Sequence, residues 1–227
     1  MRTRRFALMT LLATAGLDSV RGAAPPGSGP RGRQNVFQAI LETQPQATPE
    51  LATDEFKVFL AGRSGVVLDA RSKLGFDLAH VPGSTNIEET GLLRIAQTLP
   101  AATTPIVVYA DGPFSDRVTL RAGELLNMGY TNVSRYQLGL AVWRALGNTA
   151  ATSLEGFRRI FRGNGAVLVD ARSRAEFAAG SIPAAETVLP GEVGDAGKDR
   201  RLQFHDHATR IVVFGNSESE ARAVAQE

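Results

Sequence analysis

GVVLDARS at residues 65–72 and GAVLVDARS at residues 165–173 are two copies of one pattern, and they decide the fold. Each is a short apolar run that ends in Asp-Ala-Arg-Ser, with Asp69 aligned to Asp170 at an offset of 101 residues. An apolar run followed at once by polar residues is typical of a buried parallel strand. A period of this length indicates a duplicated domain and excludes a solenoid of short repeats.

The flanking sequence keeps the same register. At the offset of 101, the matching pairs are Phe56 with Phe157, Phe76 with Phe177, and Pro82 with Pro183. Further on, the apolar run 106–109 matches 211–214 at an offset of 105. The additional residues of the second copy are expected in a surface loop, where insertion costs little loop-closure entropy.

Helical and strand patterns alternate in the first copy. The predicted elements, in order, are a helix from Thr53 with Thr53 as its N-cap, a strand at 66–69, a helix at 88–99, a strand at 105–109, a helix at 115–128 that ends at Gly129, a strand from 132 and a helix at 138–146. This alternation predicts an α/β protein with two tandem domains, each a parallel sheet flanked by helices.

The second copy is shorter than the first. Glu227 aligns with Ala122, inside the helix that follows the second strong strand, so the last strand and helix of the first copy have no counterpart. We therefore predict a C-terminally incomplete second domain. A parallel strand without its neighbour exposes an apolar sheet edge, so low stability or a covering partner is expected.

The N-terminus resembles a secretory signal. Arg2, Arg4 and Arg5 precede an apolar stretch at 6–17 that is too short to span a bilayer, and small residues allow cleavage before Ala23. The predicted organisation is a signal peptide at 1–22, a Pro/Gly-rich lead-in with a short helix at 23–47, a first domain at 48–150 and a truncated second domain at 151–227. A buried or peripheral N-terminal helix is the alternative, and twin-arginine export is a less favoured route.

Removal of residues 1–22 takes away four arginines and one aspartate, which changes the net charge from +2 to −1. The basic character of the whole chain therefore gives no argument for nucleic-acid binding. We expect a periplasmic or secreted protein with no membrane span after signal removal.

The chain contains no cysteine. Disulfides, cysteine nucleophiles, thiolate zinc sites and iron–sulfur clusters built from this chain are thereby excluded.

Several motifs resemble the rhodanese family. Asp69-Ala70-Arg71, the turn Ala79–Ser84 (AHVPGS) and the segment 138–143 (LGLAVW) are similar to that family's D-x-R, G-H-I-P-G-A and G-G-x-x-x-W motifs. The second copy repeats Asp170-Ala171-Arg172 and Pro183. The residues that the resemblance assigns to structural motifs are Asp69, Arg71, His80, Pro82, Gly83, Asp170, Arg172 and Pro183.

The resemblance implies sulfur transfer through a persulfide on a cysteine that begins the loop after the central strand. Ala110 and Gly215 stand at those two positions, so neither copy has the nucleophile. The first loop continues as Asp111, Gly112, Pro113, Phe114, Ser115, Asp116 and Arg117. Its two carboxylates, and those of Glu218 and Glu220 in the second loop, oppose an anionic sulfur donor.

Other candidate sites are weaker. Ser115 as a nucleophile needs a base, and His80 lies in a turn that the resemblance makes structural, so we expect Ser115 to cap the next helix instead. His205 and His207 offer two metal ligands without a third. Pro113 and Phe114 are expected either to contact a ligand or a partner, or to be buried against the former active site.

We therefore expect a non-catalytic, tandem rhodanese-like module that binds a protein partner or a small anion, without cofactor or metal. The alternative is a sulfurtransferase-related enzyme whose thiol comes from a partner chain or from the substrate.

Overall fold

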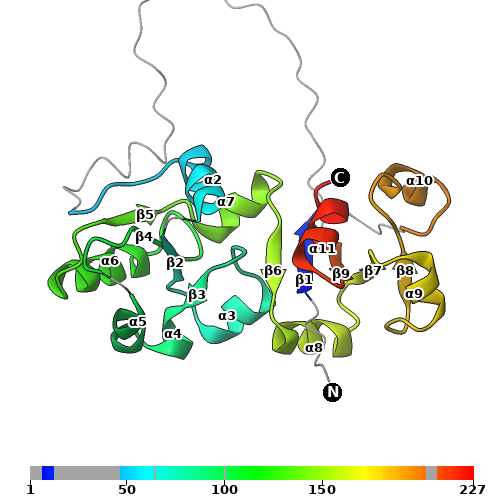
Figure 1. The fold of residues 1–227 in the computed structure, drawn as a ribbon, viewed down its shortest axis with the longest axis horizontal. Coiled ribbons are helices and arrows are strands. Elements are labelled where there is room, and N and C mark those ends of the chain that lie inside the picture. Colours follow the sequence, from blue (N-terminus) through cyan, green and yellow to red (C-terminus); the bar gives the residue numbers. More distant parts are fainter. Residues whose placement is uncertain (1–6, 13–46, 64, 100, 203–208) are drawn as a thin grey trace, which may run out of the picture.

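The computed structural model describes residues 7–12, 47–63, 65–99, 101–202 and 209–227, which form two α/β domains side by side (Figure 1). Residues 23–46 of the predicted lead-in and short helix (23–47), most of the predicted signal peptide, and the stretch with His205 and His207 lie outside these residues. Among the described residues, no helix is long and apolar enough to cross a bilayer.

The first domain has a four-stranded parallel sheet. Its strands lie in the order β3-β2-β4-β5, and their bounds are β2 (Val66–Asp69), β3 (Thr85–Asn86), β4 (Ile106–Tyr109) and β5 (Val133–Tyr136). Outside β5, Glu50 adds a parallel bridge to Arg135. The helices are α2 (Thr53–Gly62), α3 (Lys73–Leu78), α4 (Ile87–Thr90), α5 (Leu92–Thr98), α6 (Arg117–Asn127) and α7 (Gly139–Ala145).

Alternate residues of β4 supply two separate cores, because successive side chains of a strand point to opposite faces. On one face, Ile106 and Val108 pack in a cluster with Val118 and Leu125 of α6. On the other face, Val107 and Tyr109 pack with Phe56 of α2 and Trp143 of α7. The apolar run predicted as a buried strand is therefore covered by helices on both sides.

The second domain contributes three parallel strands in the order β8-β7-β9: β7 (Val167–Asp170), β8 (Ala185–Thr187) and β9 (Arg210–Gly215). Its helices are α8 (Leu154–Arg162), α9 (Arg174–Ala178), α10 (Val193–Lys198) and α11 (Glu218–Ala225). The predicted parallel α/β architecture is thus confirmed in both domains.

Two further strands extend the second sheet. β1 (Ala7–Leu12) runs antiparallel to β9 on one side and to β6 (Ala150–Thr152) on the other, which gives the order β6-β1-β9-β7-β8. Figure 1 shows β1 in blue between β6 and the red β9. In the full chain, residues 7–12 therefore cover the edge of β9 that the incomplete second domain would otherwise expose. The alternative of an N-terminal helix is wrong for these residues, which are extended.

A short interface joins the domains. His80 and Ala151 exchange two main-chain hydrogen bonds of 2.8 Å. The Ser153 hydroxyl donates to the Asp77 carboxylate at 2.6 Å, and the Ser153 N–H donates to the Asp77 carbonyl at 3.0 Å. Since Ser153 also caps α8 by accepting from the Gly156 N–H, the start of α8 is held directly against the end of α3.

Three helix boundaries differ from the prediction. Gly91, with a φ of 78°, splits the predicted helix at 88–99 into α4 and α5, because this left-handed conformation ends a right-handed helix. Ala52 is the N-cap of α2 in place of Thr53, since the Glu55 carboxylate accepts the Ala52 N–H at 2.7 Å. α6 begins after Asp116, so Ser115 does not cap it.

Candidate functional site

The loop 110–116 joins β4 to α6 at the carboxyl edge of the first sheet. Ala110 is fully buried and belongs to the core cluster that contains Val118 and Ala122 of α6. Its methyl group can neither ionise nor carry sulfur. The position assigned to the nucleophile is therefore part of the apolar core.

Main-chain carbonyls hold this loop closed. The Leu140 N–H donates to the Ala110 carbonyl and the Ala141 N–H to the Asp111 carbonyl, each at 2.9 Å. Gly139 has a φ of +66°, and a Cβ there would lie 2.6 Å from the Ala110 carbonyl oxygen, so only glycine allows this close approach.

Gln137 is a second anchor of the loop and was not predicted from the sequence. Its side-chain amide donates to the carbonyls of Pro113 and Ser115, both at 3.0 Å, and the residue is buried. The sequence offers only its position directly after a strand, whereas the structure shows that the amide is buried and must therefore find hydrogen-bond partners.

The charged residues of the loop face solvent. Asp111, Asp116 and Arg117 are exposed, Gly112, Pro113 and Ser115 are half-buried, and Phe114 is 75% exposed. Of the two environments expected for Phe114, the structure shows the exposed one. The tip of the loop therefore presents an aromatic ring between two carboxylates.

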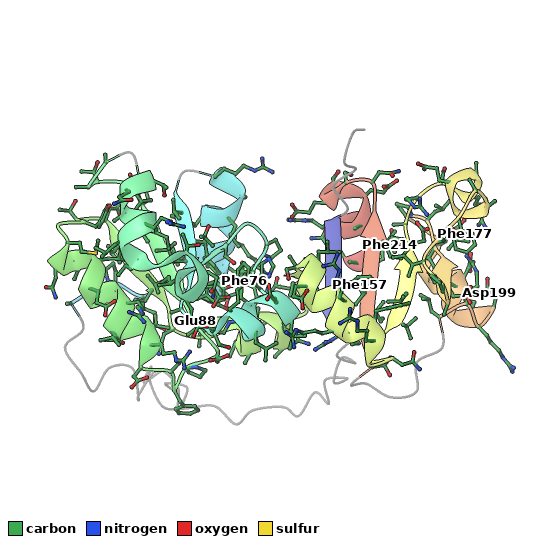
Figure 2. All side chains as sticks on the ribbon, turned by 90° about the horizontal axis from the view of Figure 1, so that it is seen from below. Phe76, Glu88, Phe157, Phe177, Asp199 and Phe214 are labelled. Carbon is green, nitrogen blue, oxygen red and sulfur yellow. The ribbon has the colours of Figure 1, made fainter. Side chains whose placement is uncertain are left out.

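A cavity of about 230 Å³ lies beside the loop. Its lining residues are Ala70, Ile87, Glu88, Arg117, Leu120 and Arg121. Glu88, labelled in Figure 2, accepts the Lys73 N–H, and Arg121 forms an ion pair with Glu124 at 2.7 Å. Glu88 and Glu124 therefore offset part of the positive charge that Arg117 and Arg121 bring to the cavity.

Asp69 and Arg71 form a buried network beneath this edge. Asp69 accepts hydrogen bonds from the Arg71 N–H at 2.9 Å, from the guanidinium at 2.6 Å and from the Tyr109 hydroxyl at 2.6 Å. Arg71 also donates to the Ala79 carbonyl at 2.6 Å. Burial first, and then the charge of Asp69, raises the pKa of Tyr109 well above its ordinary value, so this hydroxyl stays protonated and donates.

The turn 79–84 is attached to the same network. The Val81 N–H donates to the Tyr109 hydroxyl at 2.9 Å. Pro82 and Gly83 border an open cleft of about 830 Å³ that α2 and α11 also line. Nδ1 of His80 lies 2.8 Å from the Phe76 carbonyl and the His80 ring stacks on Phe76 at 3.9 Å, whereas no hydrogen bond joins His80 and Ser115 within the described residues. The structure therefore does not bring this serine and histidine together.

His80 gives a prediction for the pH dependence of stability. Burial lowers the pKa of His80, although the Phe76 carbonyl and the nearby carboxylates oppose this shift. The pKa of His80 is lower in the folded chain than in the unfolded chain, so protonation of His80 favours unfolding. The contribution of neutral His80 to the free energy of unfolding is therefore complete above about pH 6.5 and is lost as the pH falls towards the folded-state pKa. Denaturant unfolding at about pH 7.5 and about pH 5.5 should show lower stability at the acidic pH.

The matched variant is His80→Phe, which preserves an aromatic ring on Phe76 and removes the titrating group. The loss of stability between the two pH values should be smaller in this variant than in the parent chain. Equal losses in both proteins would contradict a role for His80.

The second domain repeats the buried ion pair. Asp170 accepts the Arg172 N–H at 3.0 Å and the guanidinium at 2.6 Å, and Ser181 takes the place of the tyrosine by donating at 2.5 Å. Burial would raise the pKa of Asp170, but the hydrogen bonds from Arg172 and Ser181 lower it overall. Pro183 lies exposed in the following turn.

The loop after β9 holds a carboxylate of its own. The Asn216 N–H donates to Oε2 of Glu220 at 2.6 Å, and a Cβ on Gly215 would lie 2.7 Å from the same oxygen. Ser217 caps α11 by accepting the Glu220 N–H at 3.2 Å. The Glu220 side chain therefore fills the space that a residue larger than glycine would need at position 215.

The part of the chain that the structure describes contains no group of three or more His, Asp and Glu side chains that could hold a metal ion. The weak His205 and His207 motif lies outside the described residues and stays untested.

Comparisons with known proteins agree with the duplication. The family model described as "Rhodanese-like domain" matches residues 52–146 and again residues 153–227. No curated protein matches the sequence.

Solved structures with similar folds are distant. The Alr3790 protein from Anabaena sp. is 22% identical over 48% of this chain and 85% of its own, with a TM-score of 0.40. Thiosulfate sulfurtransferase from Pseudomonas aeruginosa is 19% identical over 84% of this chain and 42% of its own, with a TM-score of 0.43. The BH2092 protein from Bacillus halodurans is 16% identical over 52% of this chain and 85% of its own, also with a TM-score of 0.43.

Proposed function

Since the chain belongs to the rhodanese-like domain family and carries the domain twice, we propose that it is a binding module that does not transfer sulfur. The observation that carries the proposal is the pair Ala110 and Gly215 at the two nucleophile positions of a cysteine-free chain. Persulfide chemistry needs a thiolate, and neither residue supplies one.

A protein partner suits the site better than a small anion. In the second domain the Glu220 carboxylate already accepts the loop N–H of Asn216, so an anion there would meet both a filled space and a like charge. In the first domain Asp111 and Asp116 flank the exposed Phe114. Aromatic side chains are enriched in protein-binding surfaces, whose rim is polar.

A thiol donated by another chain is the second candidate, and the closed loop argues against it. Ala110 has no exposed surface, and Gln137 and the start of α7 hold the loop carbonyls in place. A foreign sulfur atom would have to displace these contacts before it reached the position of the missing side chain.

We place the mature protein in the periplasm or outside the cell, with residues 1–22 as the export signal, the first domain at 48–150 and the second from 151. The support is the arginine-rich start, the short apolar stretch and the small residues before Ala23. Mass spectrometry of the exported protein should find Ala23 at its N-terminus. An intact N-terminus on protein recovered from the cytoplasm would contradict this proposal.

The function is tested by assaying transfer of sulfur from thiosulfate to cyanide with the purified chain. We expect a rate equal to the blank, while an active rhodanese measured alongside supplies the positive control. Turnover above the blank that survives repeated purification would overturn the proposal.

Restoring only the cysteine should not restore the activity. In Ala110→Cys the thiol replaces a side chain with 0% exposure, and burial keeps a thiol neutral and unreactive. We expect its alkylation to be at least ~100-fold slower than that of Phe114→Cys, whose position is 75% exposed. The rates can be compared under identical conditions because the parent chain has no thiol.

The same two variants should both stay at the blank rate in the sulfur-transfer assay. Sulfur transfer by Ala110→Cys would mean that the loop still has an active geometry and that only the nucleophile was lost.

A further inference from the structure

β1 occupies a gap between β9 and β6, which we name the strand slot. We propose that the strand slot is a binding site for an extended, uncharged segment of about six residues. Residues 7–12 fill it in the full chain, and an apolar segment of a partner protein replaces them once residues 1–22 are removed. The replacement by a partner segment rests on the proposed export signal.

The two sheets show that the slot is a regular position of the fold. In the first domain the order β3-β2-β4-β5 is followed by the bridge at Glu50, and in the second the order is β8-β7-β9-β1-β6. β1 therefore stands where β5 stands in the first domain. β5 is parallel to β4, whereas β1 is antiparallel to β9, so the slot is filled by an added strand of opposite direction.

Both faces of β9 are apolar, which makes an unfilled slot costly. Val213 packs in a cluster with Val224 of α11. On the other face, Phe214 packs with Phe157 of α8, and Figure 2 labels these two phenylalanines. Without a strand in the slot, β9 would be a buried strand with one unpaired row of main-chain N–H and C=O groups. Such an edge pairs readily with another chain.

β6 forms the opposite wall and connects the slot to the first domain. One of its edges pairs with β1, with Leu8 opposite Thr152 and Thr10 opposite Ala150. At the other edge, Ala151 exchanges two main-chain hydrogen bonds with His80. A strand in the slot therefore joins the second sheet to the turn 79–84 of the first domain, and its loss should loosen that connection.

The register defines the ligand. Six residues of β1 pair with β9, from Ala7 opposite Gly215 to Leu12 opposite Arg210, and the segment ALMTLL has no charged residue. Main-chain hydrogen bonds supply most of the recognition in strand addition, so other uncharged sequences of this length are expected to fit.

Cysteine pairs test whether residues 7–12 fill the slot in the full chain. Met9 lies directly opposite Val213, at the Cα separation of about 5 Å that a disulfide requires. Mild oxidation should cross-link Met9→Cys with Val213→Cys. The control pair is Met9→Cys with Val212→Cys, which is shifted by one residue to the opposite face and should stay reduced. Equal cross-linking of both pairs, or of neither, would refute the occupancy.

Peptide exchange tests the slot as a binding site. A protease site placed after residue 22 allows the folded full chain to be cut, and a labelled ALMTLL peptide with terminal lysines is then added. We expect the peptide to bind the cut protein, to protect from exchange those amides of 211–214 that face the slot, and to leave the uncut protein unbound. The same peptide with proline in place of the threonine should bind at least ~tenfold more weakly, because proline removes a ladder N–H.

Equal binding of both peptides, or equal binding to cut and uncut protein, would overturn the proposal. If the cut protein aggregates, refolding with the ALMTLL peptide should recover soluble monomer and refolding with the proline peptide should not. Recovery that is the same with both peptides, or a soluble dimer that forms without peptide, also counts against it. These readouts do not depend on sulfur transfer or on cleavage in cells, so failure of the proposed function is recognised separately.

Discussion

Replacement of Asp69 by alanine is expected to lower the free energy of unfolding of the first domain by about 3–5 kcal/mol. Asp69 has 0% exposure and Arg71 only 5%, so the substitution leaves a guanidinium buried without its counterion. The Tyr109 hydroxyl loses its acceptor in the same step. Chemical denaturation followed by the fluorescence of Trp143 measures the loss, because this single tryptophan packs on Phe56 inside the affected core.

Two control variants distinguish the effect of breaking the buried Asp69–Arg71 pair from the effect of removing any charged side chain. Asp195 pairs with Lys198 on the surface, where the side chains are 74% and 82% exposed, so Asp195→Ala should change stability by less than about 0.5 kcal/mol. The double variant Asp69→Ala with Arg71→Met removes both charges and should recover part of the loss. A loss below about 1 kcal/mol for Asp69→Ala alone would contradict the assigned role.

The parts of the fold that sequence predicted well are those with a local signature. Val66–Asp69 and Ile106–Tyr109 are strands as expected, because a short apolar run bounded by polar residues leaves few alternatives. Predictions at helix ends were less accurate. At Gly91 a single left-handed residue divides a continuous helical pattern, and at Ser115 the helix begins later than the hydroxyl suggested.

The strand slot and the position of the Glu220 carboxylate beside Gly215 could not be predicted from sequence. β1 joins the sheet through main-chain pairing, which places few demands on side-chain identity, and its partners lie about 140 and about 200 residues further along the chain. The sequence identifies Glu220 only as a charge that opposes an anion. Its contact with the Asn216 N–H depends on the curl of the loop into α11, which only the structure shows.

Replacement of Gly156 by alanine, at the junction of the two domains, is expected to cause the second large loss of stability. A Cβ at this position in α8 would lie 1.8 Å from the Asp77 carbonyl oxygen and 2.3 Å from the carbonyl carbon. These are main-chain atoms of α3 and cannot rotate away, so Gly156→Ala must push α8 off the first domain. We expect a loss of about 3 kcal/mol or more and separate unfolding transitions for the two domains, measured by Trp143 fluorescence and by circular dichroism.

The matched control is Gly123→Ala, which makes the same change inside α6. A Cβ on Gly123 meets nothing within 4 Å, so the better helix propensity of alanine should stabilise the protein by about 0.5–1 kcal/mol. If Gly156→Ala lowers the free energy of unfolding and Gly123→Ala raises it, the loss of stability arises at the contact between α8 and Asp77. If Gly156→Ala unfolds like the parent chain, the two domains do not need this close approach, and the hydrogen bonds from Ser153 and Ala151 alone must hold them together.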